Sequence, residues 1–151
     1  MNIEEVFEEY LDDIYRYLFS LCKDHYLAED LLQETFYRAF LNINFLNMDN
    51  IKPWLFKVSH NLLIDHFRKN KRNVLIDDDQ LQLMKSSTNI EESILRDEMM
   101  KTILDVIRLL PLKQQTAILL CDFHDLSYEE CAEIMGVSLA SFKSSLHRGR
   151  R

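Results

Sequence analysis

The chain has 151 residues and carries 25 Asp and Glu against 18 Lys and Arg, a formal charge of −7. Hydrophobic residues make up 47% of it, which is enough to build a core and excludes a generally disordered protein. Gly and Pro number only two each. Because these residues mark turns, their scarcity predicts long helices with short connections.

The start of the chain, "MNIEEVFEEY", is acidic and lacks the basic and apolar segments of a secretion signal. No apolar run approaches the length that crosses a bilayer. We therefore expect a soluble, intracellular, all-α protein.

The cysteines Cys22, Cys121 and Cys131 are irregularly spaced, as is typical of reduced thiols in an intracellular protein. Together with Cys121 and Cys131, His124 could suggest a zinc site. These residues supply only three ligands, and two of them fall among apolar neighbours on predicted helices. We expect no metal and no cofactor.

Three helices are predicted in the first half of the chain. Apolar residues from Ile3 to Leu21 recur at steps of three and four, which indicates an amphipathic helix. Asp24 can cap a second helix, whose apolar positions are Leu27, Leu31, Leu32, Phe36, Ala39, Phe40 and Ile43. Pro53 lies where the first turn of a third helix tolerates proline, and this helix continues to about Lys71.

The third helix ends in a cluster of cations on an otherwise acidic chain: Arg68, Lys69, Lys71 and Arg72. Two interpretations stay open. A helix C-terminus attracts cations through its dipole, and a local basic patch also suits a polyanion such as nucleic acid.

Residues 73–95 contain three consecutive aspartates, Asp77 to Asp79, and a polar run from Ser86 to Asn89, with weak periodicity. Loops of this length are uncommon inside compact domains. The segment therefore predicts a flexible acidic linker between two helical domains, residues 1–72 and 96–151.

The second half resumes a helical pattern that ends at Pro111, with apolar positions Met99, Ile103, Val106, Ile107 and Leu110. A further helix carries apolar residues from Leu112 to Cys121.

The segment "LSYEECAEIMGVSLASFKSSLHRGRR" predicts a helix-turn-helix. Ser127 and Glu130 form a capping box, Gly136 fits a turn with positive φ, and Ser138 can cap a final helix with an inward face of Leu139, Phe142 and Leu146. The outward face has donors and cations without an acid: Ser141, Lys143, Ser144, His147, Arg148 and Arg151. Such a helix suits the major groove of DNA.

Three segments, in this order and spacing, resemble bacterial extracytoplasmic-function sigma factors of the sigma-70 family: "AEDLLQETFYRAF", "KPWLFKVSHNLLIDHFRK" and "LSYEECAEIMGVSLASFKSSLHRGR". The resemblance covers nearly the whole chain. It implies two helical domains that join core RNA polymerase, direct it to the −10 and −35 elements of promoters and help melt the DNA. It implies neither an enzyme nor catalytic residues. In the family the last helix usually continues beyond the point where this sequence stops, so we expect its end to fray.

By resemblance, the second helix docks on the clamp helices of the polymerase's largest subunit. The docking residues would be Asp30, Gln33, Glu34 and Arg38, while Leu31 and Phe36 pack inward. The alternative is a solvated face on which Glu34 and Arg38 pair with each other.

The third helix places residues 54, 58, 61, 65, 68 and 72 on one face, because they are three or four apart. By resemblance, this helix and the loop before it hold the melted −10 strand, with a flipped base near Asn61. The residues assigned to this site are Trp54, Asn61, Asp65, Arg68, Lys69 and Arg72. For Trp54, core packing and base stacking both stay open. We expect His60 and His66 on the surface.

The resemblance also implies partners: promoter DNA, the polymerase flap for the second domain, and an anti-sigma factor. The acidic linker would enter the path of nascent RNA. The location would be cytoplasmic, or at the membrane when an anti-sigma factor holds the protein there, without insertion of the chain itself.

Two rival functions stay open. A stand-alone helix-turn-helix repressor would bind duplex DNA without polymerase, usually as a symmetric dimer. A helical scaffold that binds only protein would leave both basic faces without a purpose.

Overall fold

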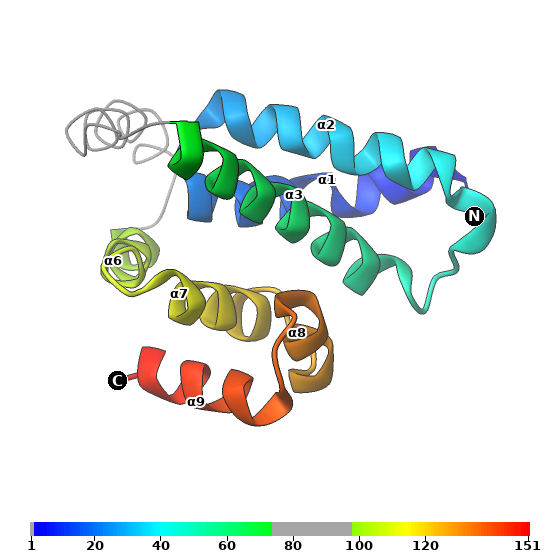
Figure 1. Ribbon diagram of the computed structural model, residues 1–151. Helices are drawn as coiled ribbons and strands as arrows, with labels where there is room; N and C mark the ends of the chain where they lie inside the picture. The colour runs from blue at the N-terminus through cyan, green and yellow to red at the C-terminus, as the bar shows by residue number, and fades with distance from the viewer. Residues whose placement is uncertain (1, 74–97) are drawn as a thin grey trace.

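The computed structural model describes residues 2–73 and 98–151, which fold into helices and turns (Figure 1). Helices α1, α2 and α3 lie side by side with alternating chain direction, and α6 to α9 form a second group that packs against the first. Within the described ranges the fold is therefore all-α and has two helical units, as predicted. Apart from Asn73, which ends α3, the predicted linker lies outside the described residues.

The first domain begins with α1 (Ile3–Cys22) and α2 (His25–Leu41). The side chain of Asn2 accepts a hydrogen bond from the Glu5 N–H and so caps α1. Asp24 caps α2, as predicted, by accepting hydrogen bonds from the N–H groups of Tyr26 and Leu27. Both caps satisfy backbone donors that a helix N-terminus would otherwise leave unpaired.

A short 3-10 helix, η1 (Ile43–Phe45), leads into α3 (Ile51–Asn73). Asn47 organises the turn between them, because its side-chain oxygen accepts hydrogen bonds from the N–H groups of Asp49 and Asn50. Pro53 lies in the first turn of α3, where its missing N–H costs nothing.

The core of the first domain is formed by apolar side chains with no exposed surface: Ile14, Tyr17, Leu18, Leu55, Phe56 and Leu63. Burial of each such side chain contributes about 1.5–3 kcal/mol. Phe40, one of the apolar positions of the second predicted helix, does not join this core, because 56% of this side chain is exposed. α2 instead packs through the small residues Ala28, Thr35 and Ala39 together with Phe36, which lets it lie close to α1.

The second domain contains α6 (Glu98–Ile107), α7 (Leu112–Ile118), α8 (Tyr128–Met135) and α9 (Leu139–Gly149). Its core includes Leu119, Leu120, Ile134, Phe142 and Leu146. Of the apolar positions that indicated this helix, Met99, Ile103 and Val106 are exposed and Ile107 is buried; Leu104 is buried beside it.

The helix predicted to run to Cys121 changes its winding before that residue. After α7 the chain forms a π-helical segment, η2 (Leu119–Phe123), in which the His124 N–H donates to the Leu119 carbonyl five residues earlier. This wider turn brings His124 to the side of the second domain that faces the first.

The two domains share a packed interface. α8 packs on α3 and α7 contacts α1. The His124 ring lies 4.8 Å from the Phe56 ring and 5.9 Å from the Tyr17 ring, measured between centroids. The hydrophobic core is therefore continuous from one domain to the other. None of the helices within residues 2–73 and 98–151 is long and apolar enough to span a bilayer.

Candidate nucleic-acid interface

The predicted strand-binding face of α3 is a stripe along one side of a regular helix. Asn61, Asp65 and Arg68 are exposed, and Lys69 is exposed beside them. Trp54 is partly buried and packs against the core. Core packing therefore accounts for part of its surface, and the remaining exposed surface leaves base stacking open as a prediction.

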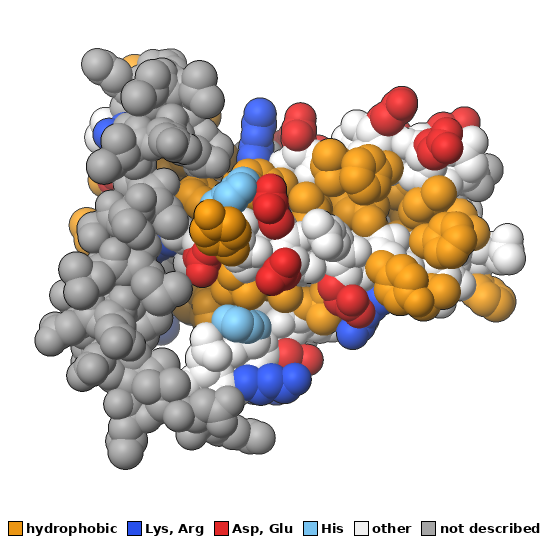
Figure 2. Space-filling view, turned by 90° about the horizontal axis from the view of Figure 1, so that it is seen from above, with side chains coloured by type: hydrophobic (Ala, Val, Ile, Leu, Met, Phe, Trp, Pro, Cys, Tyr) orange, Lys and Arg blue, Asp and Glu red, His pale blue; other side chains and the backbone are white. Residues whose placement is uncertain are grey.

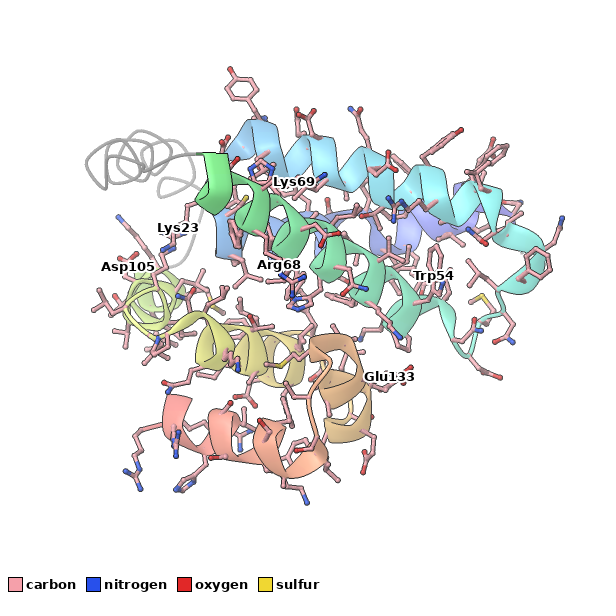
Figure 3. The ribbon with its side chains drawn as sticks, in the orientation of Figure 1. Lys23, Trp54, Arg68, Lys69, Asp105 and Glu133 are labelled. Atoms are coloured by element: carbon pink, nitrogen blue, oxygen red, sulfur yellow. The ribbon has the colours of Figure 1, made fainter. Side chains whose placement is uncertain are left out.

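Arg72 is the last member of the predicted stripe. Its backbone belongs to α3, but its side chain lies outside the described residues. The stripe that can be described thus runs from Trp54 to Arg68, which are both labelled in Figure 3.

The stripe combines groups of different chemistry. The amide of Asn61 offers two donors and an acceptor, and the guanidinium of Arg68 offers charged donors. An indole provides a surface on which an unstacked base can lie. This combination suits a single strand of nucleic acid, whose base edges and phosphates are both accessible.

His60 is not on the surface, and this prediction is wrong. The residue is 7% exposed, and its Nδ1 lies 2.8 Å from the hydroxyl of Tyr17. Burial lowers the pKa of His60 to about 4, so the imidazole is neutral near pH 7. Its position four residues after Phe56, on the buried side of α3, was the signal available in the sequence. His66 is partly exposed and bonds with Asn70 at 2.9 Å.

The predicted helix-turn-helix is confirmed as α8, a turn and α9. The Ser127 and Glu130 side chains form the capping box, with bonds of 3.1 and 2.9 Å. Gly136 has φ of +68°, and Ser138 caps α9 by accepting from the Ser141 N–H. Gly136 is favoured because residues with a Cβ rarely adopt this backbone conformation.

The outward face of α9 is open to solvent. Phe142 and Leu146 are buried on the inner side. Five of the predicted DNA-binding residues are exposed on α9: Ser141, Lys143, Ser144, His147 and Arg148. The sixth, Arg151, is exposed but follows the end of the helix at Gly149, so its predicted place on the helix is wrong. The face therefore offers cations and neutral hydrogen-bonding groups, without a carboxylate that would repel phosphate.

The C-terminal end of α9 is attached to the rest of its domain. A Cβ on Gly149 would lie 2.8 Å from Cδ1 of Ile118, so the absence of a side chain permits this close approach of α9 to α7. Arg150 donates to both carboxylate oxygens of Asp122, at 2.6 and 3.2 Å. These contacts fix the direction in which α9 projects its outer face.

α2 carries a second candidate surface, for protein and not for DNA. The predicted docking residues Asp30, Gln33, Glu34 and Arg38 are all exposed. Glu34 and Arg38 form an ion pair of 3.0 Å, as the solvated alternative also predicted. A pair this exposed contributes little to stability, so both groups stay available to a partner.

Sequence reasoning missed an apolar patch at the end of α2. We define it as Tyr37, Phe40, Leu41 and Phe45, which are 57%, 56%, 58% and 81% exposed. In Figure 2 hydrophobic side chains gather at one end of this face, next to acidic side chains. Exposed apolar patches of this kind mark protein contacts.

The thiols are free in the structure, and none forms a disulfide. Burial raises the pKa of Cys22 to about 11 and that of Cys131 to about 12, which disfavours the thiolate. Among the residues that the structure describes, no group of three or more His, Cys, Asp or Glu could hold a metal ion.

Comparison with known proteins gives consistent matches. The family model described as Sigma-70 region 2 matches residues 6–73, and that described as Sigma-70, region 4 matches residues 100–151. The chain is 38% identical to the ECF RNA polymerase sigma factor SigM of Bacillus subtilis (strain 168), covering 100% of this chain and 92% of that protein. It is 30% identical to SigW, another ECF sigma factor of the same organism, covering 97% and 83%.

The fold is similar to that of a solved sigma factor, RpoE of Bartonella quintana, in complex with the anti-sigma factor NepR. The TM-score is 0.78 at 26% identity, and the match covers 97% of this chain and 91% of that one. The similarity therefore extends over both domains.

Proposed function

Because this chain belongs to the extracytoplasmic-function sigma factors of the sigma-70 family, we propose that residues 1–72 bind core RNA polymerase and the −10 element, and that residues 96–151 bind the −35 element. The protein is a transcription initiation factor that gives RNA polymerase its promoter specificity. A stand-alone repressor is not favoured, since the matches are to RNA polymerase sigma factors.

The observation that carries the assignment of DNA contacts is the outer face of α9. The cations Lys143 and Arg148 are exposed on this helix. Gly136 forms the turn of the helix-turn-helix, and Ser138 caps the N-terminus of α9. Contacts to base edges would give selectivity, and contacts to phosphates would fix the register. Ser141, Ser144, His147 and Arg151 complete this surface.

The stripe on α3 is proposed to hold the melted −10 strand. Asn61 would pair with the edge of an extruded base. Trp54 offers the exposed part of its indole for stacking, and Arg68, Lys69 and Arg72 would hold phosphates. Asp65 precedes these cations on α3. Its carboxylate would repel a phosphate placed directly beside it, because like charges repel.

The polymerase contact is proposed on α2. Asp30, Gln33, Glu34 and Arg38 would bind the clamp helices of the largest subunit, with the apolar patch beside them. An apolar centre with a polar border is the usual composition of a protein interface. The flap of the polymerase is the proposed partner of the second domain.

We infer an anti-sigma factor as a further partner, in the cytoplasm where promoters are transcribed. The similar RpoE was solved with such a partner bound, and the likeness covers both domains of this chain. The protein's own role is proposed to be binding and melting of DNA, without catalysis of a reaction.

Binding to core polymerase tests the proposed docking surface. Glu34→Lys should weaken the association by at least ~1 kcal/mol, or about fivefold, because it reverses a charge at the contact. Asp12→Lys is the matched control, since Asp12 is an exposed acid on α1. Pull-down with purified core polymerase measures both. Equal binding of Glu34→Lys and Asp12→Lys would move the docking surface elsewhere.

A further inference from the structure

The contact between the domains includes one charged pair at its edge. The Nζ of Lys57 on α3 lies 3.4 Å from Oε1 of Glu133 on α8. The two side chains are 45% and 72% exposed. Beside this pair the interface is aromatic, formed by His124 against Phe56 and Tyr17.

Lys57 borders the stripe proposed to hold the −10 strand. At 3.6 residues per turn, Trp54, Asn61 and Arg68 all fall within about 60° of Lys57 around the axis of α3. Asn61 is one turn further along the same row. Figure 3 shows Trp54 and Arg68 on α3, with Glu133 on α8 below it. A phosphate of a strand lying on this stripe would be within reach of the flexible Lys57 side chain.

We infer that Glu133 and the DNA backbone compete for Lys57, so that the packing of the second domain on α3 lowers the affinity of the first domain for a single strand. This inference rests on the proposed function of the α3 stripe. Glu133 occupies the ammonium group that a phosphate of the strand would otherwise bind. DNA that captures Lys57 therefore has to displace the carboxylate.

The energetics favour such an exchange. An ion pair this exposed contributes about 0.2–1 kcal/mol, so a phosphate can replace the carboxylate without a large cost. Each Lys that neutralises a phosphate releases a condensed counterion, and this release favours the DNA-bound state at low salt. Lys57 would then act in both states, as a contact between domains and as a contact to DNA.

The test uses the full chain and a fluorescently labelled single-stranded DNA oligonucleotide of mixed sequence, with binding followed by fluorescence anisotropy. Glu133→Gln should bind about two- to fivefold more tightly than the wild type. Glu129→Gln is the matched control, because Glu129 is an exposed acid on the same helix and the change in net charge is the same. It should bind as the wild type does.

Lys57→Ala should weaken binding and reduce the slope of log K against log salt by about 0.7, the value for one contact to a single strand. The double variant Lys57→Ala with Glu133→Gln should bind as Lys57→Ala alone does, because the carboxylate acts only through Lys57. Thermal unfolding of each variant establishes that the fold is retained.

Three outcomes would overturn the inference: equal binding by Glu133→Gln and Glu129→Gln, tighter binding by Glu133→Gln that persists without Lys57, or no binding by any variant. The proposed function is judged separately by association with core polymerase. That association should be the same for the Lys57 and Glu133 variants as for the wild type, since neither residue lies on α2.

Discussion

α3 and α9 both present cations to solvent, but the protein holds these two helices in different ways. α9 buries Phe142 and Leu146 within its own domain and leaves the opposite side open. α3 is enclosed from two directions: Leu55 and Leu63 pack in the first domain, and Phe56 also meets His124 of the second.

The two helices also expose different kinds of side chain. α9 offers only cations and neutral hydrogen-bonding groups, which suit the outside of a duplex. α3 adds an indole, an amide and a carboxylate, which suit bases that have left the stack. The difference predicts that strand binding at α3 depends on the arrangement of the domains, whereas duplex binding at α9 depends on its own domain alone.

The largest expected effect is a loss of folding stability in acid, caused by two histidines at α3 and its interface with the second domain. His60 is buried and His124 is partly buried, and the loss of solvent around each ring lowers its pKa to about 4 from an ordinary value of 6.5, so both imidazoles are neutral near pH 7. The unfolded chain then binds more protons than the folded chain below pH 6.5. Stability should therefore be complete above pH 6.5 and fall as the pH drops toward 4, by about 2 kcal/mol per histidine between pH 7 and 5.

Urea unfolding at pH 7, 6 and 5 measures this loss. The pKa of His124 also depends on the nearby charges of Asp13, Asp125, Lys52 and Arg16. The wild type is therefore compared with His124→Gln in the same buffers. This variant should lose about half of the pH dependence. An unfolding free energy that is constant from pH 7 to 5 would contradict the lowered pKa of these two imidazoles.

A smaller effect is expected at α9. Arg148→Ala and Lys143→Ala should each cost about 1–3 kcal/mol in binding to promoters with a −35 element if the side chain contacts a base. A residue that contacts only phosphate should weaken all promoters equally and lower the salt dependence. Transcription from promoters varied at single −35 positions distinguishes these cases. Unchanged activity of both variants at every promoter would remove α9 from the DNA interface.

The smallest effect is expected at Asn61, where one side chain is removed from an extended stripe. Asn61→Ala should reduce open-complex formation by about 1 kcal/mol, roughly fivefold, through the loss of a hydrogen bond to one extruded base. Polymerase binding and stability should stay near the wild type, since Asn61 is exposed. Permanganate footprinting of the melted region provides the measurement. If the variant opens promoters altered at each −10 position as the wild type does, the base pocket lies elsewhere.

Local sequence signals predicted the features that depend on a few neighbouring residues. Asp24, Ser127 and Ser138 cap the helices that their positions indicated, and Gly136 has the positive φ that its turn requires. Each of these features involves bonds that span two or three residues. The exposure of the α9 face followed from helical periodicity in the same way.

Features that depend on packing between distant segments could not be predicted in this way. Phe40 is apolar but exposed, because α2 packs through alanines and a threonine. His124 is partly buried because the π-helical η2 turns it toward Tyr17 and Phe56. No short motif encodes a contact between two domains. The roles assigned to individual residues in binding DNA and polymerase remain predictions.

Trp54 is the single tryptophan of the protein, and its partial burial beside the α3 stripe has an optical consequence. All of the indole emission of the unlabelled protein originates at the proposed strand-binding face. A base that stacks on the exposed part of the ring changes this emission, whereas a duplex bound at α9 lies in another domain and leaves it unaltered. In the isolated chain, this single fluorophore distinguishes the two proposed contacts with DNA.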